Sequence, residues 1–238
     1  MGRILTGLKN VLYPRRCPAC HDAVRPFGAV ICDGCAGRFS YIKAPVCPRC
    51  GKQLADETEQ LCEGCRRISS GLSGGVALLH YDDTARASMG KFKYEGRCEY
   101  ADFYAEAILA RYRGKILSWR PQRIVPVPIH KSRQKERGYN QAAELARRLG
   151  DSLSIPVDET LLVREKKTAA QKELGANERA ENLKNAFAAA RPAEGVRRVL
   201  LVDDIFTTGL TMKNCVEALK AAGVEKVYGC SVCISEDY

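Results

Sequence analysis

Apolar and polar positions follow two different periods along the chain from residue 71 onward. Short apolar runs, of the kind that form buried strands, alternate with stretches whose apolar residues recur every three or four positions, as in amphipathic helices. The pattern predicts strands at residues 74–81, 124–129, 161–163, 198–202 and 226–234, and helices at residues 84–94, 99–113, 140–150 and 210–222. Strands that alternate with helices favour an α/β fold, in which a parallel sheet carries helices on both faces.

The first 70 residues lack this alternation and carry a regular set of cysteines instead. The 238-residue chain holds 12 cysteines, and eight of them form four Cys-x-x-Cys pairs that start 15 residues apart. These pairs are Cys17/Cys20, Cys32/Cys35, Cys47/Cys50 and Cys62/Cys65. Two such pairs can complete a tetrahedral four-thiolate site, for which Zn²⁺ is the usual ion. An iron–sulfur cluster is an alternative, and a disulfide framework is disfavoured because we find no secretion signal.

Even spacing leaves open how the four pairs combine. Sequential pairing gives two successive ribbons with one ion each, whereas interleaved pairing gives a crossed site. We favour two ribbons joined by residues 39–46, because each ribbon could then fold around its own ion. A region this small buries little apolar surface, so metal binding would supply most of its folding energy. The expected domains are residues 1–70, with an N-terminal helix and the double zinc ribbon, and residues 71–238.

The formal net charge of +10 is concentrated in one segment. Residues 111–148 hold eleven Lys/Arg against two Asp/Glu, whereas residues 1–70 hold eleven against six. Eight thiolates on two Zn²⁺ ions would lower the net charge of the protein to about +6 and leave the ribbon region nearly neutral. The ribbons therefore do not favour nucleic-acid binding by charge alone. The remaining cysteines are expected to be buried small apolar residues: Cys98, Cys215, Cys230 and Cys233.

The apolar run at residues 198–202 is followed by two acids and then by a turn rich in hydroxyl groups. The acids are Asp203 and Asp204, and the turn that leads into the next helix contains Thr207, Thr208, Gly209 and Thr211. Backbone N–H groups at a helix start favour an anion, and glycine lets the backbone approach it closely. The acids would repel that anion, so they suit ribose hydroxyls or a hydrated Mg²⁺. Ligands of open parallel sheets bind at the carboxyl ends of strands, where this turn falls.

Two further polar segments follow predicted strands. Residues 129–141 contain Lys131, Arg133 and Arg137, whose cations suit a pyrophosphate group. Residues 164–174 are polar and mixed in charge, which is typical of a mobile lid or of an exposed helix. The candidate lid residues are Arg164, Lys167, Thr168 and Gln171.

Residues 199–211 closely resemble the phosphoribosyl pyrophosphate (PRPP) signature of type I phosphoribosyltransferases. The resemblance implies a type I phosphoribosyltransferase-like parallel sheet that follows the double zinc ribbon. It also implies that Asp203 and Asp204 are catalytic residues that hold the ribose 2′ and 3′ hydroxyls. By the same resemblance, the threonine–glycine turn holds the 5′-phosphate, residues 129–141 form the pyrophosphate loop, and residues 164–174 take the place of a flexible catalytic loop. Mg²⁺ would then bind together with PRPP.

Other motifs resemble the ComF/GntX family over nearly the full chain. They are the double zinc ribbon, the Lys91-Phe92-Lys93-Tyr94 run and the Arg137-Gly138-Tyr139-Asn140-Gln141 motif, followed by Thr168, Gln171, Arg179 and Asn182. Competence members of that family are linked to natural transformation and to incoming single-stranded DNA in the cytosol. The resemblance therefore implies a cytoplasmic protein whose partners are PRPP, single-stranded DNA and proteins of the competence machinery.

Two functions remain open at this point. The protein is either a phosphoribosyltransferase with an unidentified acceptor, or a non-catalytic nucleic-acid-binding or adaptor protein that retains a PRPP-sensing site. Tyr112, Trp119 and Tyr139 lie among the cations of residues 111–148 and would stack on single-stranded DNA. An apolar stripe within residues 4–12 would pack on the protein, on a partner or on a membrane surface. No stretch of the sequence is apolar over the length that a transmembrane segment needs.

Overall fold

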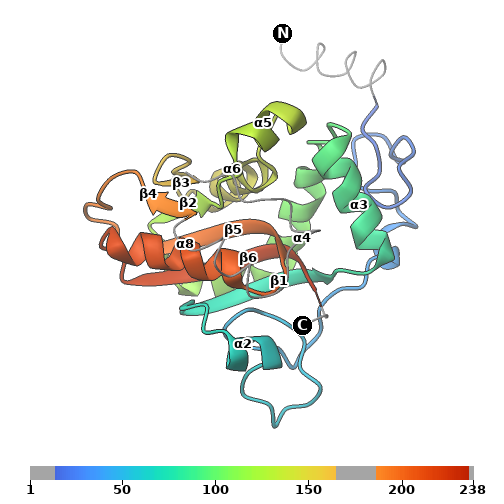
Figure 1. Ribbon diagram of the computed structural model, residues 1–238. Coiled ribbons are helices and arrows are strands. Elements are labelled where there is room, and N and C mark those ends of the chain that lie inside the picture. Colours follow the sequence, from blue (N-terminus) through green and yellow to red (C-terminus); the bar gives the residue numbers. More distant parts are fainter. Residues whose placement is uncertain (1–13, 165–185, 236–238) are drawn as a thin grey trace.

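The computed structural model describes residues 14–164 and 186–235. Its centre is a sheet of four parallel strands in the order β1-β6-β5-β2 (Figure 1). These strands are β1 (Gly74–His80), β2 (Arg123–Pro126), β5 (Arg198–Phe206) and β6 (Lys226–Ile234). A separate antiparallel pair joins β3 (Leu162–Arg164) to β4 (Phe187–Ala189). The parallel sheet confirms the α/β fold that the sequence predicts.

Helices cover both faces of the sheet and create two hydrophobic cores. Helices α3 (Asp83–Tyr94), α4 (Tyr100–Ser118) and α6 (Gln141–Leu153) share one core with Leu200 and Val202 of β5. Helix α8 (Leu210–Ala221) shares the other core with Val199 and Leu201 of the same strand. Alternate residues of a strand face opposite sides of a sheet, so a nearly continuous apolar strand supplies both cores. Three short helices complete the described fold: η1 (Ala36–Arg38), α2 (Glu63–Arg67) and α5 (Lys131–Arg137).

Local predictions differ from the structure at β5, β2 and α5, and α4 extends to Ser118 rather than ending at residue 113. Strand β5 does not end at Val202 but continues through both acids to Phe206, because β6 pairs with it as far as Phe206↔Ile234. Strand β2 ends at Pro126 rather than at residue 129, since prolines have no N–H to extend the ladder. The expected pyrophosphate loop contains a short helix, α5, which ends at Gly138 in the left-handed conformation.

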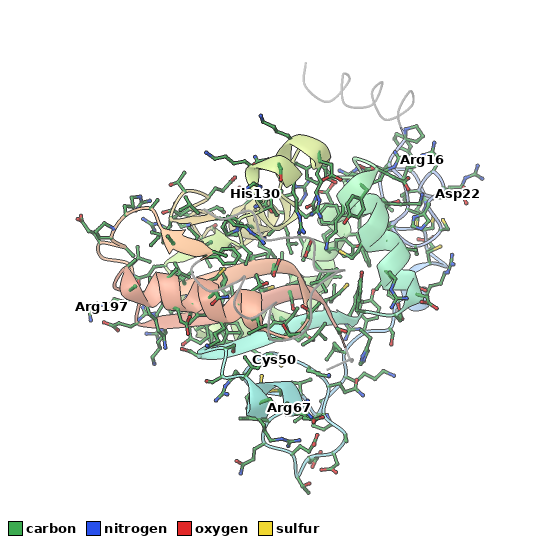
Figure 2. All side chains as sticks on the ribbon, in the orientation of Figure 1. Arg16, Asp22, Cys50, Arg67, His130 and Arg197 are labelled. Atoms are coloured by element: carbon green, nitrogen blue, oxygen red, sulfur yellow. The ribbon has the colours of Figure 1, made fainter. Side chains whose placement is uncertain are left out.

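The two cysteine-rich segments pack on different parts of the molecule (Figure 1). The first, which we call ribbon 1 (residues 14–38), lies beside α3 and joins the core of α3, α4 and α6. The second, ribbon 2 (residues 46–67), lies below β1 and joins the core that contains α8. In Figure 2, Arg16 and Asp22 mark ribbon 1, and Cys50 lies directly below β1. The predicted domain boundary after residue 70 stays a prediction.

Irregular segments cover both edges of the parallel sheet. The linker between the ribbons runs antiparallel to β1: Ile42 N–H donates to Leu78 O at 3.0 Å, and His80 N–H donates to Ser40 O at 2.9 Å. At the opposite edge, the backbone of residues 156–158 exchanges hydrogen bonds of 3.0 and 2.9 Å with Ile124 of β2. The linker therefore does more than connect the ribbons, because it satisfies backbone groups of an edge strand.

The remaining cysteines divide into two kinds. Cys215, Cys230 and Cys233 are buried, as predicted. The same prediction is wrong for Cys98, which is exposed in the loop before α4. In the described part of the chain, no helix combines the length and the apolar character needed to cross a membrane.

Candidate functional site

A polar cleft of about 210 Å³ lies at the carboxyl ends of β2 and β5. Five separate segments surround it: the residue after β1, the end of α3, the β2–α6 connection with α5 and the start of α6, the end of β3, and the β5–α8 turn. The lining residues are Tyr81, Lys93, Val127, Pro128, Ile129, Arg133, Arg137, Asn140, Ala142, Arg164, Asp203, Asp204, Ile205, Thr207 and Thr211. The parallel topology brings these segments together, because the carboxyl ends of neighbouring strands lie at the same end of the sheet.

The two acids of β5 stand in different surroundings within this cleft. Asp204 Oδ2 lies 2.9 Å from Lys93 Nζ, and each of these two side chains is only 16% exposed. Asp203 Oδ1 accepts a hydrogen bond of 2.9 Å from the backbone N–H of Asp204. On the α8 side of the sheet, burial raises the pKa of the Cys215 thiol, and the charge of Asp203 raises it further. The two acids therefore approach the cleft from opposite faces of the strand.

Burial and charge shift the titration of the groups at this site. Burial raises the pKa of Asp203 to about 8, and the charge of Asp204 acts in the same direction against the attraction of Lys93 and Arg164. For Lys93, burial by itself would lower the pKa, but the charge and hydrogen bond of Asp204 outweigh it and raise the pKa. Burial therefore favours the neutral form of Asp203, whereas Asp204 favours the charged form of Lys93.

The turn after β5 has the geometry of an anion cradle. Gly209 caps α8 with φ = +81°, and a Cβ atom there would lie 2.9 Å from the Phe206 ring, so the turn requires glycine. The side chains of Thr207 and Thr211 line the cleft, whereas Thr208 Oγ1 accepts a hydrogen bond of 3.4 Å from Leu210 N–H. The structure thus places two of the three predicted threonines at the cleft and uses the third to shape the turn.

Helix α5 brings arginines to the opposite side of the cleft. Arg133 and Arg137 line it, whereas Lys131 is exposed and is not among the lining residues. The Arg137 guanidinium lies 5.0 Å from the centre of the Tyr94 ring, and its Nη1 donates to Gln141 Oε1 at 2.9 Å. Its buried Nε has no hydrogen-bond partner among the described residues, so it is available to a ligand.

One predicted lid residue lies in the described structure. Arg164, at the end of β3, lines the cleft and lies 5.2 Å from the centre of the Phe187 ring. Burial lowers the pKa of Arg164, and the nearby Arg133 adds to this effect. The other predicted residues of this region lie outside the described residues: Lys167, Thr168, Gln171, Arg179 and Asn182.

Lys93 and Asn140 line the cleft, although the sequence patterns predict no site role for either residue. Lys93 continues the buried positions Ala85 and Met89 of α3 at a spacing of four, and a lysine on an apolar stripe is a signal of a buried charge partner. Asn140 caps α6 through Ala142 N–H and donates from Nδ2 to Val127 O at 3.0 Å. Asn140 therefore fixes the connection that carries the arginines.

The eight paired cysteines form two groups of four: Cys17, Cys20, Cys32 and Cys35, and Cys47, Cys50, Cys62 and Cys65. Within each group the possible ligand atoms lie within 4.8 Å of one another. Zn–S bonds of about 2.3 Å would place the sulfurs of a tetrahedral site roughly 3.8 Å apart. The Sγ atoms of Cys50 and Cys62 are 3.5 Å apart, which is too far for a disulfide. The residues fit Zn²⁺, and the grouping confirms sequential pairing.

The basic segment 111–148 is less available to nucleic acid than its sequence suggests. Arg147 pairs with Glu144 and Glu159, and Arg148 pairs with Glu144 and Asp102. These acids come from three separate segments, so the structure neutralises part of the positive charge that is concentrated in the sequence. These two arginines therefore contribute less positive charge to a nucleic-acid surface than the sequence suggests.

The aromatic residues of this segment are also engaged within the protein. Tyr112 and Tyr139 donate hydrogen bonds from their hydroxyl groups to backbone carbonyls, and Trp119 stacks on Tyr228 with ring centroids 4.7 Å apart. These contacts hold all three half-buried rings within the protein, and their stacking on DNA stays a prediction. Tyr94, whose ring contacts the cleft residue Arg137, is 64% exposed and is one of three large hydrophobic residues exposed in the described structure.

Two known protein families match separate parts of this chain. The double zinc ribbon domain family matches residues 8–66, and the phosphoribosyl transferase domain family matches residues 135–236. Competence protein F of Haemophilus influenzae is 32% identical over 223 residues, which cover 89% of this chain and 93% of that protein. This chain belongs to the ComF family.

Other ComF relatives match along similar lengths. The DNA utilization protein YhgH of Escherichia coli K12 is 30% identical over 209 residues, which cover 85% of this chain and 89% of that protein. Competence protein ComFC of Bacillus subtilis is 27% identical over 200 residues, which cover 81% of this chain and 79% of that protein. The two Cys₄ groups fall within the residues that the double zinc ribbon family matches, and the β5–α8 side of the polar cleft falls within those that the phosphoribosyl transferase family matches.

Proposed function

We propose that this protein binds PRPP with Mg²⁺ in the polar cleft and transfers the phosphoribosyl group to an acceptor that serves DNA utilization. The observation that carries this proposal is the convergence of two carboxyl groups, three arginines and the glycine turn of α8 around one cleft. PRPP offers a matching set of groups, since it has two ribose hydroxyls, a 5′-phosphate and a pyrophosphate. The phosphoribosyl transferase match and the relatives' names support the same conclusion.

Each part of the cleft has a proposed role. Asp203 and Asp204 accept hydrogen bonds from the ribose hydroxyls. The β5–α8 turn binds the 5′-phosphate through Thr207, Thr208, Gly209 and Thr211. The pyrophosphate contacts Lys131, Arg133 and Arg137, and the segment that begins at Arg164, with Lys167, Thr168 and Gln171, closes over the ligand. Two Zn²⁺ ions, held by the Cys₄ groups, have a structural role in the ribbons.

The chemistry follows from the charges of the cleft. The bond between ribose C1 and the pyrophosphate oxygen breaks, and pyrophosphate leaves with the bonding electron pair. The cations of α5 stabilise the negative charge that develops on the leaving group, while positive charge develops on the ribose ring. An acceptor nucleophile then forms a new bond to C1 and loses a proton to solvent. Mg²⁺ that arrives with PRPP adds charge stabilisation on the pyrophosphate side.

Calorimetric titration of the zinc-loaded protein with PRPP and Mg²⁺ tests the proposal. We expect saturable binding that falls at least about 100-fold in an Asp203→Asn/Asp204→Asn double variant, which removes two charge-assisted acceptors at nearly constant shape. Asp151→Asn, on the exposed end of α6, is a matched control and should bind like the wild type. Absence of binding by folded wild-type protein at millimolar PRPP would overturn the proposal.

A second candidate function, binding of single-stranded DNA, rests on a surface beside the cleft. Lys135 of α5 is exposed, and Tyr94 presents an exposed ring to solvent, so charge and stacking are available together. Cytoplasmic competence proteins would then be the expected partners. A Lys135→Glu variant should lose DNA affinity and keep PRPP affinity. If PRPP competes with DNA for the wild-type protein, the two ligands share one surface.

A further inference from the structure

Lys93 occupies an unusual position for a lysine, because it is nearly buried and bonds to a proposed ligand-binding acid. Its Nζ lies 2.9 Å from Asp204 Oδ2, and its side chain is 16% exposed. Lys93 comes from α3, whereas Asp204 comes from β5, so the ion pair joins two elements that border the cleft. A buried ammonium group is stable only when an anion or a set of acceptors compensates for its lost hydration.

A ribose that binds to Asp204 would weaken the ion pair that compensates Lys93 for its lost hydration. A ribose hydroxyl that donates to the Asp204 carboxylate competes with Lys93 for the same oxygens. If Lys93 then lost its partner without replacement, the uncompensated charge would oppose ligand binding. A ligand that binds well must therefore supply a new anion within reach of Lys93.

The charges around the cleft show which ligands can do so. Four cationic side chains line it, Lys93, Arg133, Arg137 and Arg164, against the two acids Asp203 and Asp204. Even with both acids ionised, this lining carries two positive charges in excess. A riboside that carries several negative charges complements both the cations and the acids of the cleft, whereas a neutral riboside complements the acids alone.

We propose that Lys93 changes partner when the ligand binds: it leaves Asp204 for the pyrophosphate group and thereby makes the cleft select pyrophosphate-bearing ribosides. The inference rests on the proposed PRPP site and assigns a specificity-determining residue within it. When Lys93 leaves Asp204, the carboxylate is free to accept hydrogen bonds from the ribose hydroxyls, and the new bond of Lys93 holds the pyrophosphate. One cation therefore couples recognition of the hydroxyls to recognition of the anion.

The experiment compares PRPP, ribose 5-phosphate and pyrophosphate, each with Mg²⁺, by calorimetry on the full zinc-loaded chain. Lys93→Met keeps a long unbranched side chain but removes the charge. Lys91→Met is the matched control, since Lys91 lies on the same helix and pairs with Glu95 at 2.9 Å outside the cleft lining. Zinc content and far-UV circular dichroism establish that each variant is folded.

We expect Lys93→Met to weaken PRPP and pyrophosphate binding at least about tenfold while ribose 5-phosphate binds as well as, or better than, to the wild type. Lys91→Met should leave all three affinities unchanged. Equal losses for PRPP and ribose 5-phosphate would show a structural role and overturn the inference, as would unchanged affinities. If Lys93→Met does not fold, Lys93→Arg provides the test, because a retained cation should preserve the preference for PRPP. Wild-type protein that binds neither PRPP nor pyrophosphate would overturn this inference and the proposed function together.

Discussion

The two ribbons have the same cysteine spacing but lie in different surroundings. In ribbon 2 all four cysteines are buried, whereas in ribbon 1 only Cys17 is buried. Ribbon 2 contacts the sheet through its backbone: Gly75 N–H donates to Pro48 O at 3.1 Å. Ribbon 1 contacts α4 through side chains: His21 Nδ1 lies 3.1 Å from the Tyr100 hydroxyl, and Arg15 Nη2 lies 2.8 Å from Asp102 Oδ2.

This difference shows that one motif can have two structural roles. Ribbon 2 is part of the support of the sheet, so its metal should stabilise the whole protein. Ribbon 1 has an open side, where a cleft is lined in part by Cys20, Cys32 and Arg25, so its metal is closer to solvent. The following predictions test that distinction, from the largest expected effect to the smallest.

Removal of one ligand from each ribbon should have unequal effects. Cys50→Ser should lower the free energy of unfolding by more than about 5 kcal/mol, because the buried site loses its ion and leaves thiols within a core. Cys32→Ser should lower it by roughly 2–4 kcal/mol, since this site is partly exposed. Denaturant unfolding with zinc analysis measures both effects. Equal losses would contradict the distinction.

Two glycines provide a matched pair for the backbone contact. Gly51 and Gly28 both have positive φ, +83° and +93°. A Cβ atom at Gly51 would lie 2.5 Å from Ala77 N, whereas a Cβ atom at Gly28 would have no other atom within 4 Å. Gly28→Ala should destabilise by about 1–2 kcal/mol from backbone conformation alone. Gly51→Ala should add about 1–3 kcal/mol from the clash with β1. Thermal unfolding of the two variants provides the comparison, and equal shifts would mean that ribbon 2 moves freely away from β1.

Zinc release should occur in two phases. A soluble chelator should remove the ion of ribbon 1 at least about tenfold faster than that of ribbon 2, because only local opening exposes the buried ligands. A chromogenic zinc indicator follows the release. The Cys32→Ser variant assigns the phases, since it should lack the fast one. A single phase in the wild type would indicate that the two sites open together.

The smallest effect is expected at the ionic contact of ribbon 1. Arg15 Nη2 lies 2.8 Å from Asp102 Oδ2, but the arginine side chain is 39% exposed. Arg15→Ala should therefore cost less than about 1 kcal/mol, and the difference from wild type should shrink at high salt. Denaturant unfolding at two salt concentrations measures it. A loss as large as that of Cys32→Ser would show that charge, rather than metal and packing, holds ribbon 1 in place.

The regular parts of the fold could be predicted from the sequence because their signals are local. The run that forms β6 matches its predicted bounds, and the cysteine intervals correctly indicate two four-sulfur groups. Helix α5 escaped prediction because its charged residues show no apolar stripe, and its ends depend on a His130 cap and on Gly138. Strand β5 extends past Val202 because of its partner β6, which the local apolar pattern does not contain.

The sequence predicts most residues of the candidate site, but it does not predict the ion pair between Lys93 and Asp204. The acids, the threonine turn and two arginines of α5 meet at one sheet edge, as strand topology and the family resemblance imply. The bond between Lys93 and Asp204 joins residues far apart in the sequence, so the apolar stripe of α3 indicates a buried charge partner for Lys93 but not which residue it is. Conversely, Tyr112 and Tyr139 suggested a nucleic-acid surface, because an aromatic ring among cations has the same sequence pattern whether it is exposed or packed inside.

The covered edges of the sheet also limit how a partner protein can bind. Residues 40–42 bond to β1, and residues 156–158 bond to β2, so the outer backbone groups are already paired along those stretches. A peptide that recognised this sheet by β-augmentation would have to displace one of the two segments first. At the β1 edge, that displacement would pull on the connection between two zinc sites. Recognition through side chains on the helices and ribbons avoids this barrier, and a partner that does add a strand at β1 would become sensitive to zinc supply.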